Sequence, residues 1–198
     1  MSIQLSPDVL RGYTEKLALY IPAERVAHSE NVSRAAGMLA RRWAPELEAQ
    51  SKLAGLLHDN AKAIDPTELL ARARELGLPV TAIEECYPSL LHGKVGAALL
   101  KERFGVEDAE VEQACADHVT GRRGMGTLSK ILYVADQAAA DRTFNGVEDL
   151  RSIMFEDLDA AVLLVAKHKV LHSARKSHLL EPATVDLYNS LIDKHLNG

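Results

Sequence analysis

Aromatic residues, positive charge and long apolar runs are all scarce in this chain of 198 residues. Only 5% of the residues are aromatic, too few for an extended platform on which nucleic-acid bases stack. The formal net charge of -5 argues against a surface that coats nucleic acid, because neutralising phosphates needs an excess of lysine and arginine. The longest apolar run, AAVLLVA at residues 160–166, is too short to span a bilayer. We therefore expect neither a nucleic-acid partner nor a membrane.

Cysteine is scarce as well, and the chain contains only Cys86 and Cys115. Their separation fits neither a CxxC pair nor a zinc knuckle, and two cysteines do not make a disulfide scaffold, so we expect two reduced thiols. The first residues lack the basic stretch and apolar stretch of a signal peptide. The expected location is the cytoplasm.

Helix start and stop signals, in contrast, are abundant, while the alternation typical of strands is almost absent. Ser6-Pro7 indicates one helix start, and Asp65-Pro66-Thr67-Glu68 resembles a capping box at another. We predict an all-α bundle of about eight to ten helices that forms a single domain over residues 1–198. Its metal-site core covers about 20–142, and C-terminal helices at 147–196 pack on that core. The expected helices cover about 7–17, 22–43, 45–61, 66–77, 89–105, 107–119, 127–142, 147–176 and 182–196.

Five of these helices carry histidine or aspartate on the side expected to face the core. Val32, Ala36, Leu39 and Trp43 mark the buried face of the second helix, and one step back along that face lies His28. The same reasoning places the other members of the set on inward faces: His58, Asp59, His92, His118 and Asp136. The remaining histidines, His168, His172, His178 and His195, are expected on the surface.

A single inward histidine is more often a core residue with a backbone partner than a metal ligand. Asp59 is harder to explain in that way, because buried carboxylates are rare without a partner or a metal. Four histidines and two aspartates pointing inward together would form an unpaired polar core unless a metal ion bound them. The pattern therefore favours a divalent or trivalent metal.

The order of these residues resembles the HD-domain metal-dependent phosphohydrolases. The segments RVAHSENV, LLHDNAK, HGKVGAALL, HVTGRRGM and KILYVADQAAADR together resemble the YqeK-type symmetrical bis(5'-nucleosyl)-tetraphosphatases, over roughly residues 20–190. Two departures concern substrate fit: Asn60 follows the HD pair, and AAAD precedes Arg142 without the proline that the family often has. The resemblance implies symmetric hydrolysis of diadenosine tetraphosphate to two ADP, and of related dinucleoside polyphosphates to products such as GDP.

The inward-facing residues themselves suggest a ligand set, in which one metal would be held by His28, His58, Asp59 and Asp136. Asp59 can bridge to a second metal, or to a phosphate, beside His92 and His118. Iron is the metal that the resemblance implies, as one or two ions, although Mn, Co, Ni and Zn also suit nitrogen and oxygen ligands. The residues assigned to catalysis are Asp59, Lys62, His92 and His118.

A tetraphosphate needs further cations. Lys62 follows His58 by four residues, which predicts that it shares a helix face with it, and Arg25 lies one turn before His28. The loop TGRRGMGT at 120–127 carries Arg122 and opens a helix, so its backbone could cradle an anion. Pro182 and Thr184 resemble a nucleoside-covering segment, although an ordinary helix start explains them as well. The expected substrate-binding residues are Arg25, His28, Asp59, Lys62, His92, His118, Thr120, Arg122, Asp136, Arg142, Leu180, Pro182 and Thr184.

The sequence leaves three alternatives open. Another HD-family enzyme, such as a nucleotidase or a cyclic-nucleotide phosphodiesterase, would use the same ligands. A regulatory protein could bind metal and nucleotide without turnover, and a purely structural helical module could bury its histidines as core. The choice between a monomer and a homodimer is open too.

Overall fold

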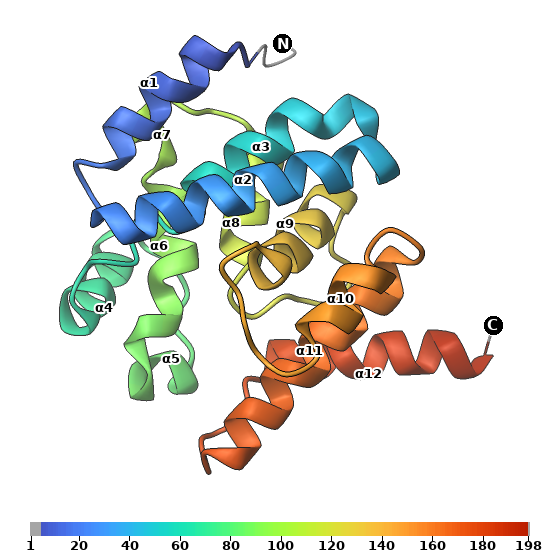
Figure 1. Cartoon of the computed structure of the whole chain (residues 1–198). Helices are drawn as coiled ribbons and strands as arrows, with labels where there is room; N and C mark the ends of the chain where they lie inside the picture. The colour runs from blue at the N-terminus through green and yellow to red at the C-terminus, as the bar shows by residue number, and fades with distance from the viewer. Residues whose placement is uncertain (1–4, 198) are drawn as a thin grey trace.

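The computed structural model describes the backbone of residues 5–197 and the side chains of residues 5–193, and its regular structure there is entirely helical (Figure 1). The all-α prediction is confirmed, and the described part holds twelve α-helices, two more than the upper end of the predicted range. His195, expected on the surface, lies outside the described side chains. The α-helices are α1 (Pro7–Leu17), α2 (Ala23–Trp43), α3 (Glu48–Leu57), α4 (Pro66–Glu75), α5 (Ala82–Cys86), α6 (His92–Ala98), α7 (Leu100–Phe104), α8 (Ala109–Asp117), α9 (Thr127–Ala138), α10 (Val147–Ile153), α11 (Leu158–Arg175) and α12 (Pro182–Asn197); short 3-10 helices occupy Pro45–Leu47 and Pro88–Leu91.

The extra helices come from local capping that breaks longer predicted segments. The predicted helix over 147–176 is divided because the Asp157 side chain accepts a hydrogen bond from the Ala160 amide at 3.0 Å and starts α11 anew. The segment 89–105 divides into a 3-10 turn, α6 and α7. Helix α5 was not predicted, and it opens on a capping box between Thr81 and Glu84. Asp65 caps α4, as expected, through the Thr67 amide at 2.8 Å.

Helix α9 ends at Ala138 rather than near Arg142, because arginine side chains take its last carbonyl groups. The Nε of Arg142 donates to the Asp136 carbonyl at 2.9 Å, and the Nε of Arg151 donates to the Ala138 carbonyl at 3.1 Å. This early end lets the chain turn back at 139–146 and brings Arg142 beside Asp136.

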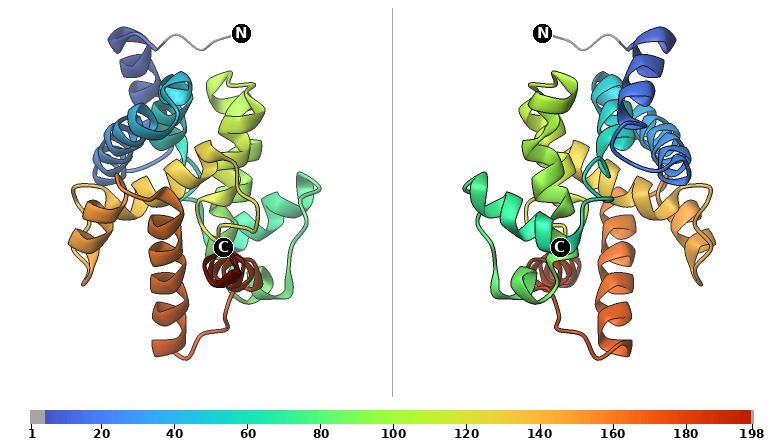
Figure 2. Two further views of the ribbon diagram at one scale, coloured as in Figure 1. Left: turned by 90° about the vertical axis from the view of Figure 1, so that its right-hand side faces the viewer. Right: turned by 90° about the vertical axis from the view of Figure 1, so that its left-hand side faces the viewer.

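The core lies where α2, α3, α8 and α9 pack together, and α2 runs along α3 (Figure 1). Val32, Ala36 and Leu39, predicted to mark the buried face of α2, are fully buried. Helix α11 packs against α9, and α12 packs against α11. Both lie away from the N-terminal helix α1, in the view of Figure 1 and in the views of Figure 2 at right angles to it. Within the described residues, no helix combines the length and apolar character that a membrane crossing requires.

Helices α2 and α3 approach each other closely at Gly55. A Cβ atom at this position would lie 2.8 Å from the Cα and 2.9 Å from the backbone nitrogen of Ser33, and backbone atoms cannot move aside without shifting a helix. The residues that follow α3 are His58 and Asp59, so this contact also fixes where they lie.

We predict that Gly55→Ala separates α3 from α2 and lowers the free energy of unfolding by about 1–3 kcal/mol. For a chain of this length, each kcal/mol lowers Tm by about 2–4 °C, which a thermal melt measures. The matched control is Gly12→Ala in α1, where no heavy atom lies within 4 Å of the added Cβ. This control should stabilise the protein by about 0.5–1 kcal/mol. Equal effects of the two substitutions would contradict the close packing of α2 and α3.

Candidate functional site

The pair His58-Asp59 lies in the turn that follows α3, rather than within the helix as the sequence suggested. Helix α3 ends at Leu57 because two side chains compete for its last carbonyl groups. The Nδ1 of His58 bonds the Gly55 carbonyl at 2.8 Å, and the Nδ2 of Asn60 donates to the Leu57 carbonyl at 2.9 Å. Asn60 also donates to the Gly96 carbonyl at 3.1 Å, so it fastens this turn to α6.

Three of the inward histidines share one hydrogen-bonding arrangement. The Nδ1 atoms of His58, His92 and His118 each bond a backbone carbonyl three residues earlier, at 2.8, 2.6 and 2.7 Å respectively. A carbonyl oxygen can only accept, so the hydrogen of each neutral ring lies on Nδ1. Each Nε2 therefore carries a free lone pair, which is the form in which histidine binds a metal.

These lone pairs converge on carboxylate oxygens. The Nε2 atoms of His92 and His118 lie 3.2 Å apart, and they lie 3.2 and 3.5 Å from the Oδ1 of Asp59. All three atoms are hydrogen-bond acceptors in neutral imidazoles and an ionised carboxylate, so they repel one another unless a proton or a cation lies between them.

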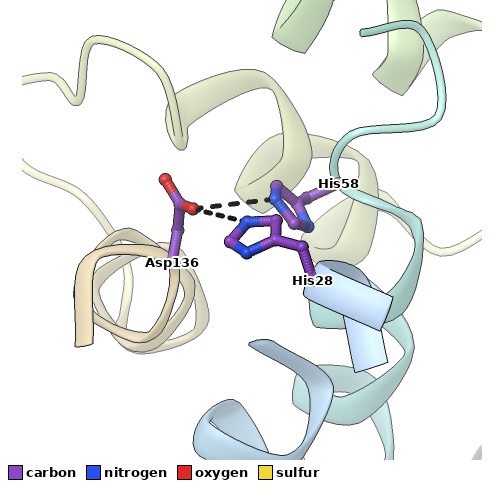
Figure 3. Close-up of side chains that lie close together, drawn as sticks. All are labelled: His28, His58 and Asp136. Atoms are coloured by element: carbon purple, nitrogen blue, oxygen red, sulfur yellow. Dashed lines mark hydrogen bonds and ion pairs between the residues drawn. The ribbon is translucent and has the colours of Figure 1, made fainter. Parts of the chain in front are cut away.

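A second group of acceptors lies next to the first and comes from α2, the turn after α3, and α9 (Figure 3). The Nε2 of His28 lies 3.2 Å from the Oδ1 of Asp136, and the Nε2 of His58 lies 3.9 Å from the same oxygen. The buried Nε2 of His58 has no hydrogen-bond partner among the described residues. One ligand atom from each residue of the triads His28–His58–Asp136 and His58–Asp59–His118 lies within 4.8 Å of the others. The donor set thus fits one or two metal ions.

Asp141 orients His28 and was missed in the sequence. Its Oδ2 accepts from the Nδ1 of His28 at 2.7 Å, and its Oδ1 accepts from the Nδ2 of Asn31 at 3.0 Å. This contact leaves the His28 Nε2 directed at Asp136, the arrangement in which a carboxylate commonly supports a metal-binding histidine. Asp141 directly precedes Arg142, which was already expected at the site, and this position could have pointed to it.

The charge state of the cluster follows from burial and from mutual attraction. Burial alone would raise the pKa values of Asp59 and Asp136, but the neighbouring histidines hold both well below the usual range. Burial lowers the pKa of His58 to about 4 and also lowers the pKa values of His92 and His118. Burial acts in the same direction on His28, but Asp136 and Asp141 outweigh it and its pKa is raised. Near neutral pH the cluster thus combines two carboxylates with at least three neutral imidazoles.

Three cations border the carboxylates, and all three were expected from the sequence. A terminal nitrogen of Arg25 lies 3.7 Å from the Oδ2 of Asp59, and the Arg142 guanidinium bonds the Asp136 carboxylate. Lys62 does not share a helix face with His58, because α3 has already ended, but the turn still brings its Nζ to 3.2 Å from the Nε2 of His92. These cations line a cavity of about 270 Å³, here named the central cavity.

The central cavity has two further polar residues that the sequence did not reveal. Lys169, on α11, donates to the His118 and Val119 carbonyls at 3.0 and 2.6 Å, and burial lowers its pKa to about 8. Gln137 donates from Nε2 to the Oδ2 of Asp136 at 2.8 Å. Lys169 has no spacing signal, because it reaches the cavity through the packing of α11 on α9. Gln137 was missed although it directly follows Asp136.

Another cavity, of about 300 Å³, adjoins the central cavity and shares Val119, Gln137 and Lys169 with it. It is called the first side cavity below. Thr120, Leu180 and Thr184, which the sequence assigned to substrate binding, line the first side cavity. The Thr184 hydroxyl donates to the Thr120 carbonyl at 2.7 Å and ties α12 to the segment after α8. Pro182 is the first residue of α12 and does not line this cavity.

Two expectations need correction. Arg122 does not line the central cavity, since its Nε donates to the Oδ1 of Asp117 at 3.0 Å and a terminal nitrogen faces the loop carbonyls of Arg123 and Gly124. His168, expected on the surface, is half-buried and stacks on Phe144 with ring centroids 4.2 Å apart.

We predict that protein freed of metal with a chelator loses stability as the pH falls below 6.5. Unfolded chains take up a proton at His58 near its ordinary pKa of 6.5, whereas the fold resists protonation until about pH 4. The lowered pKa values of His92, His118, Asp59 and Asp136 act in the same direction, and only the raised pKa of His28 opposes them.

By pH 4, His58 alone should have lowered the free energy of unfolding by about 3 kcal/mol. Denaturant melts across pH 4–7 would measure this change. His58→Gln removes this titrating group and should flatten the profile. A wild-type profile as flat as that of the variant would contradict the buried, neutral state of His58.

The chain has counterparts among known proteins in sequence and in fold. A bis(5'-nucleosyl)-tetraphosphatase, symmetrical, from Halalkalibacterium halodurans is 32% identical over 87% of this chain and 91% of its own length. A protein of the same name from Bacillus subtilis is 30% identical over 85% of this chain and 89% of its own length. A crystal structure of a Clostridium acetobutylicum protein, described as a predicted HD superfamily hydrolase involved in NAD metabolism, superposes with a TM-score of 0.89 at 31% identity, over 97% of this chain and 100% of that one.

The family model for the HD domain matches residues 25–146, which include all six clustered histidines and aspartates. The three relatives, the helical fold and the converging histidines and aspartates agree with that match, and the chain belongs to the HD-domain family.

Proposed function

We propose that this protein is a metal-dependent hydrolase that cleaves dinucleoside tetraphosphates symmetrically into two nucleoside diphosphates, such as ADP or GDP. The observation that carries the proposal is the convergence of buried acceptor atoms from four histidines and two aspartates beside three cations. The similarity to symmetrical tetraphosphatases over most of the chain supports the choice of substrate. A nucleotide-binding protein without turnover, and a structural module, are not favoured by that similarity.

The residues that would hold metal are His28, His58, Asp59 and Asp136, with His92 and His118 at a second site or at a phosphate. We propose iron, as one or two ions, with Mn, Co, Ni and Zn as alternatives that suit the same ligands. The bound metal would lower the pKa of water towards neutrality and polarise a phosphoryl oxygen.

The remaining groups of the central cavity act on the substrate. Arg25, Lys62 and Arg142 place positive charge where the tetraphosphate would lie, and charge on its oxygens grows as the central bond breaks. Arg142 also holds the end of α9 through the Asp136 carbonyl, so it binds and positions at once. The first side cavity, with Thr120, Leu180 and Thr184, would take one nucleoside.

The proposal extends to how the chain is organised. We propose that it acts as one domain, because α11 supplies Lys169 to the central cavity from outside the segment that the family model matches. A cytoplasmic location agrees with two free cysteines, one exposed and one buried, since reduced thiols are usual there. The proposal is independent of whether the protein is a monomer or a homodimer.

We predict that diadenosine tetraphosphate yields only ADP, because attack at a central phosphorus divides the molecule in half. Ion-exchange chromatography of the products checks this. Asp59→Asn removes a charged ligand while keeping the size of the side chain, and it should abolish turnover. Asp149→Asn, at an exposed position on α10, serves as the control and should leave the rate unchanged. Equal amounts of AMP and ATP would reject symmetric cleavage.

We predict that Arg142→Ala lowers kcat/KM about ten- to a hundred-fold while metal content is retained, because a charge-assisted phosphate contact is lost. Arg122→Ala is the comparison, since Arg122 is engaged by Asp117 outside the central cavity, and its kcat/KM should stay within about two-fold of wild type. A larger loss of kcat/KM for Arg122→Ala than for Arg142→Ala would contradict this assignment and indicate that the phosphates bind at the loop 120–127.

A further inference from the structure

A third cavity adjoins the central cavity, with which it shares Gln137. It measures about 210 Å³ and lies between α11 and the segment that joins α9 to α10; it is named here the second side cavity. Phe144, Leu164, Val165 and Leu171 form much of its apolar lining. Figures 1 and 2 show α11 as a long helix, and this cavity and the first side cavity both use residues of it. None of the residues assigned above to metal or substrate lines this third cavity.

The three cavities meet at a single side chain. Gln137 lines the central cavity and both side cavities, and it directly follows the expected ligand Asp136. His168 lines both side cavities, and its ring stacks on Phe144 with an angle of 22° between the rings. A ligand whose anionic centre lies in the central cavity therefore has two neighbouring apolar recesses, one toward α12 and one toward Phe144.

The charges around the second side cavity suit the same ligand. None of the described residues that line it is acidic, while Lys167 and Arg175 border it with positive charge. Phe144 and His168 offer flat ring faces, on which a purine can stack, and Asn145 offers an amide to its polar edge. An apolar recess with ring faces, an amide and basic borders fits a nucleoside attached to phosphates.

We propose that the second side cavity binds the second nucleoside of a dinucleoside polyphosphate, while the first side cavity binds the other. This inference rests on the proposed function. It adds a reason for substrate choice, because a ligand with a nucleoside at each end would occupy both recesses and place the middle of its phosphate chain at the metal-ligand cluster. A mononucleotide would fill only one recess.

The test compares two substrates that differ only in the second nucleoside. Diadenosine tetraphosphate carries it, whereas adenosine 5'-tetraphosphate lacks it and would be cleaved to ADP and pyrophosphate. Leu171→Trp fills the second side cavity from an exposed position on α11, with a side chain that is 42% exposed in the wild type. Phe144→Leu removes the stacking ring and is the second variant.

We expect both variants to lower kcat/KM for diadenosine tetraphosphate at least about ten-fold, and to change it for adenosine 5'-tetraphosphate by less than about two-fold. Leu180→Trp is the matched comparison, because Leu180 has the same exposure but lines the first side cavity, and it should impair both substrates. Leu19→Trp, at a position 79% exposed and remote from the cavities, should impair neither.

Equal losses on both substrates for Leu171→Trp and Phe144→Leu, or no loss on either, would overturn the second nucleoside site while wild-type turnover of diadenosine tetraphosphate to ADP stands. Wild-type protein that hydrolyses neither substrate when loaded with metal would instead overturn the proposed function itself. The two failures are therefore distinguishable in one set of assays.

Discussion

Six buried side chains direct more acceptor atoms at one another than there are hydrogens to share, and the rest of the structure is organised around that constraint. Backbone carbonyls take the Nδ1 hydrogens of His58, His92 and His118, and Asp141 takes that of His28. The Nε2 atoms of His58, His92 and His118 are thereby left as acceptors beside carboxylates or other rings, and among the described residues only that of His92 has a cation, Lys62, within 3.2 Å. Buried acceptors without donors are costly, so such a cluster is stable only when a cation or protons satisfy it.

Helix ends supply the required directions. His58 follows the last residue of α3, His118 follows the last residue of α8, and His92 is the first residue of α6. At these positions the chain is free to turn, and a ring can bond a carbonyl three residues back instead of continuing the helical pattern. Gly55 lets α3 approach α2 closely, which brings the pair His58-Asp59 towards His28. The early end of α9 does the same for Arg142 and Asp141.

The sequence predicted the helical class and the six clustered residues, because inward faces repeat with the helical period and show where a polar residue interrupts a core. It was wrong about the helix face shared by Lys62 and His58, because α3 ends earlier than expected, and it did not show that Arg122 lies outside the central cavity, because that depends on loop conformation. It missed Asp141, Gln137, Lys169 and the half-buried position of His168. Lys169 and His168 are placed by the packing of α11, and contacts distant along the chain leave no periodic signal. Asp141 and Gln137 stand next to Arg142 and Asp136 in the sequence, but that adjacency alone does not show which way their side chains point.

The central claim is that these acceptors exist to hold a metal ion, and thermal stability measures it most directly. Protein stripped by a chelator should melt at a higher temperature when Fe(II), Mn(II), Co(II), Ni(II) or Zn(II) is added. A metal at a hundred times its Kd stabilises by about 2.7 kcal/mol, which is roughly 5–11 °C for a chain of this length. The result that would contradict the account is an unchanged Tm with every one of these metals, together with elemental analysis that finds no metal on the dialysed protein.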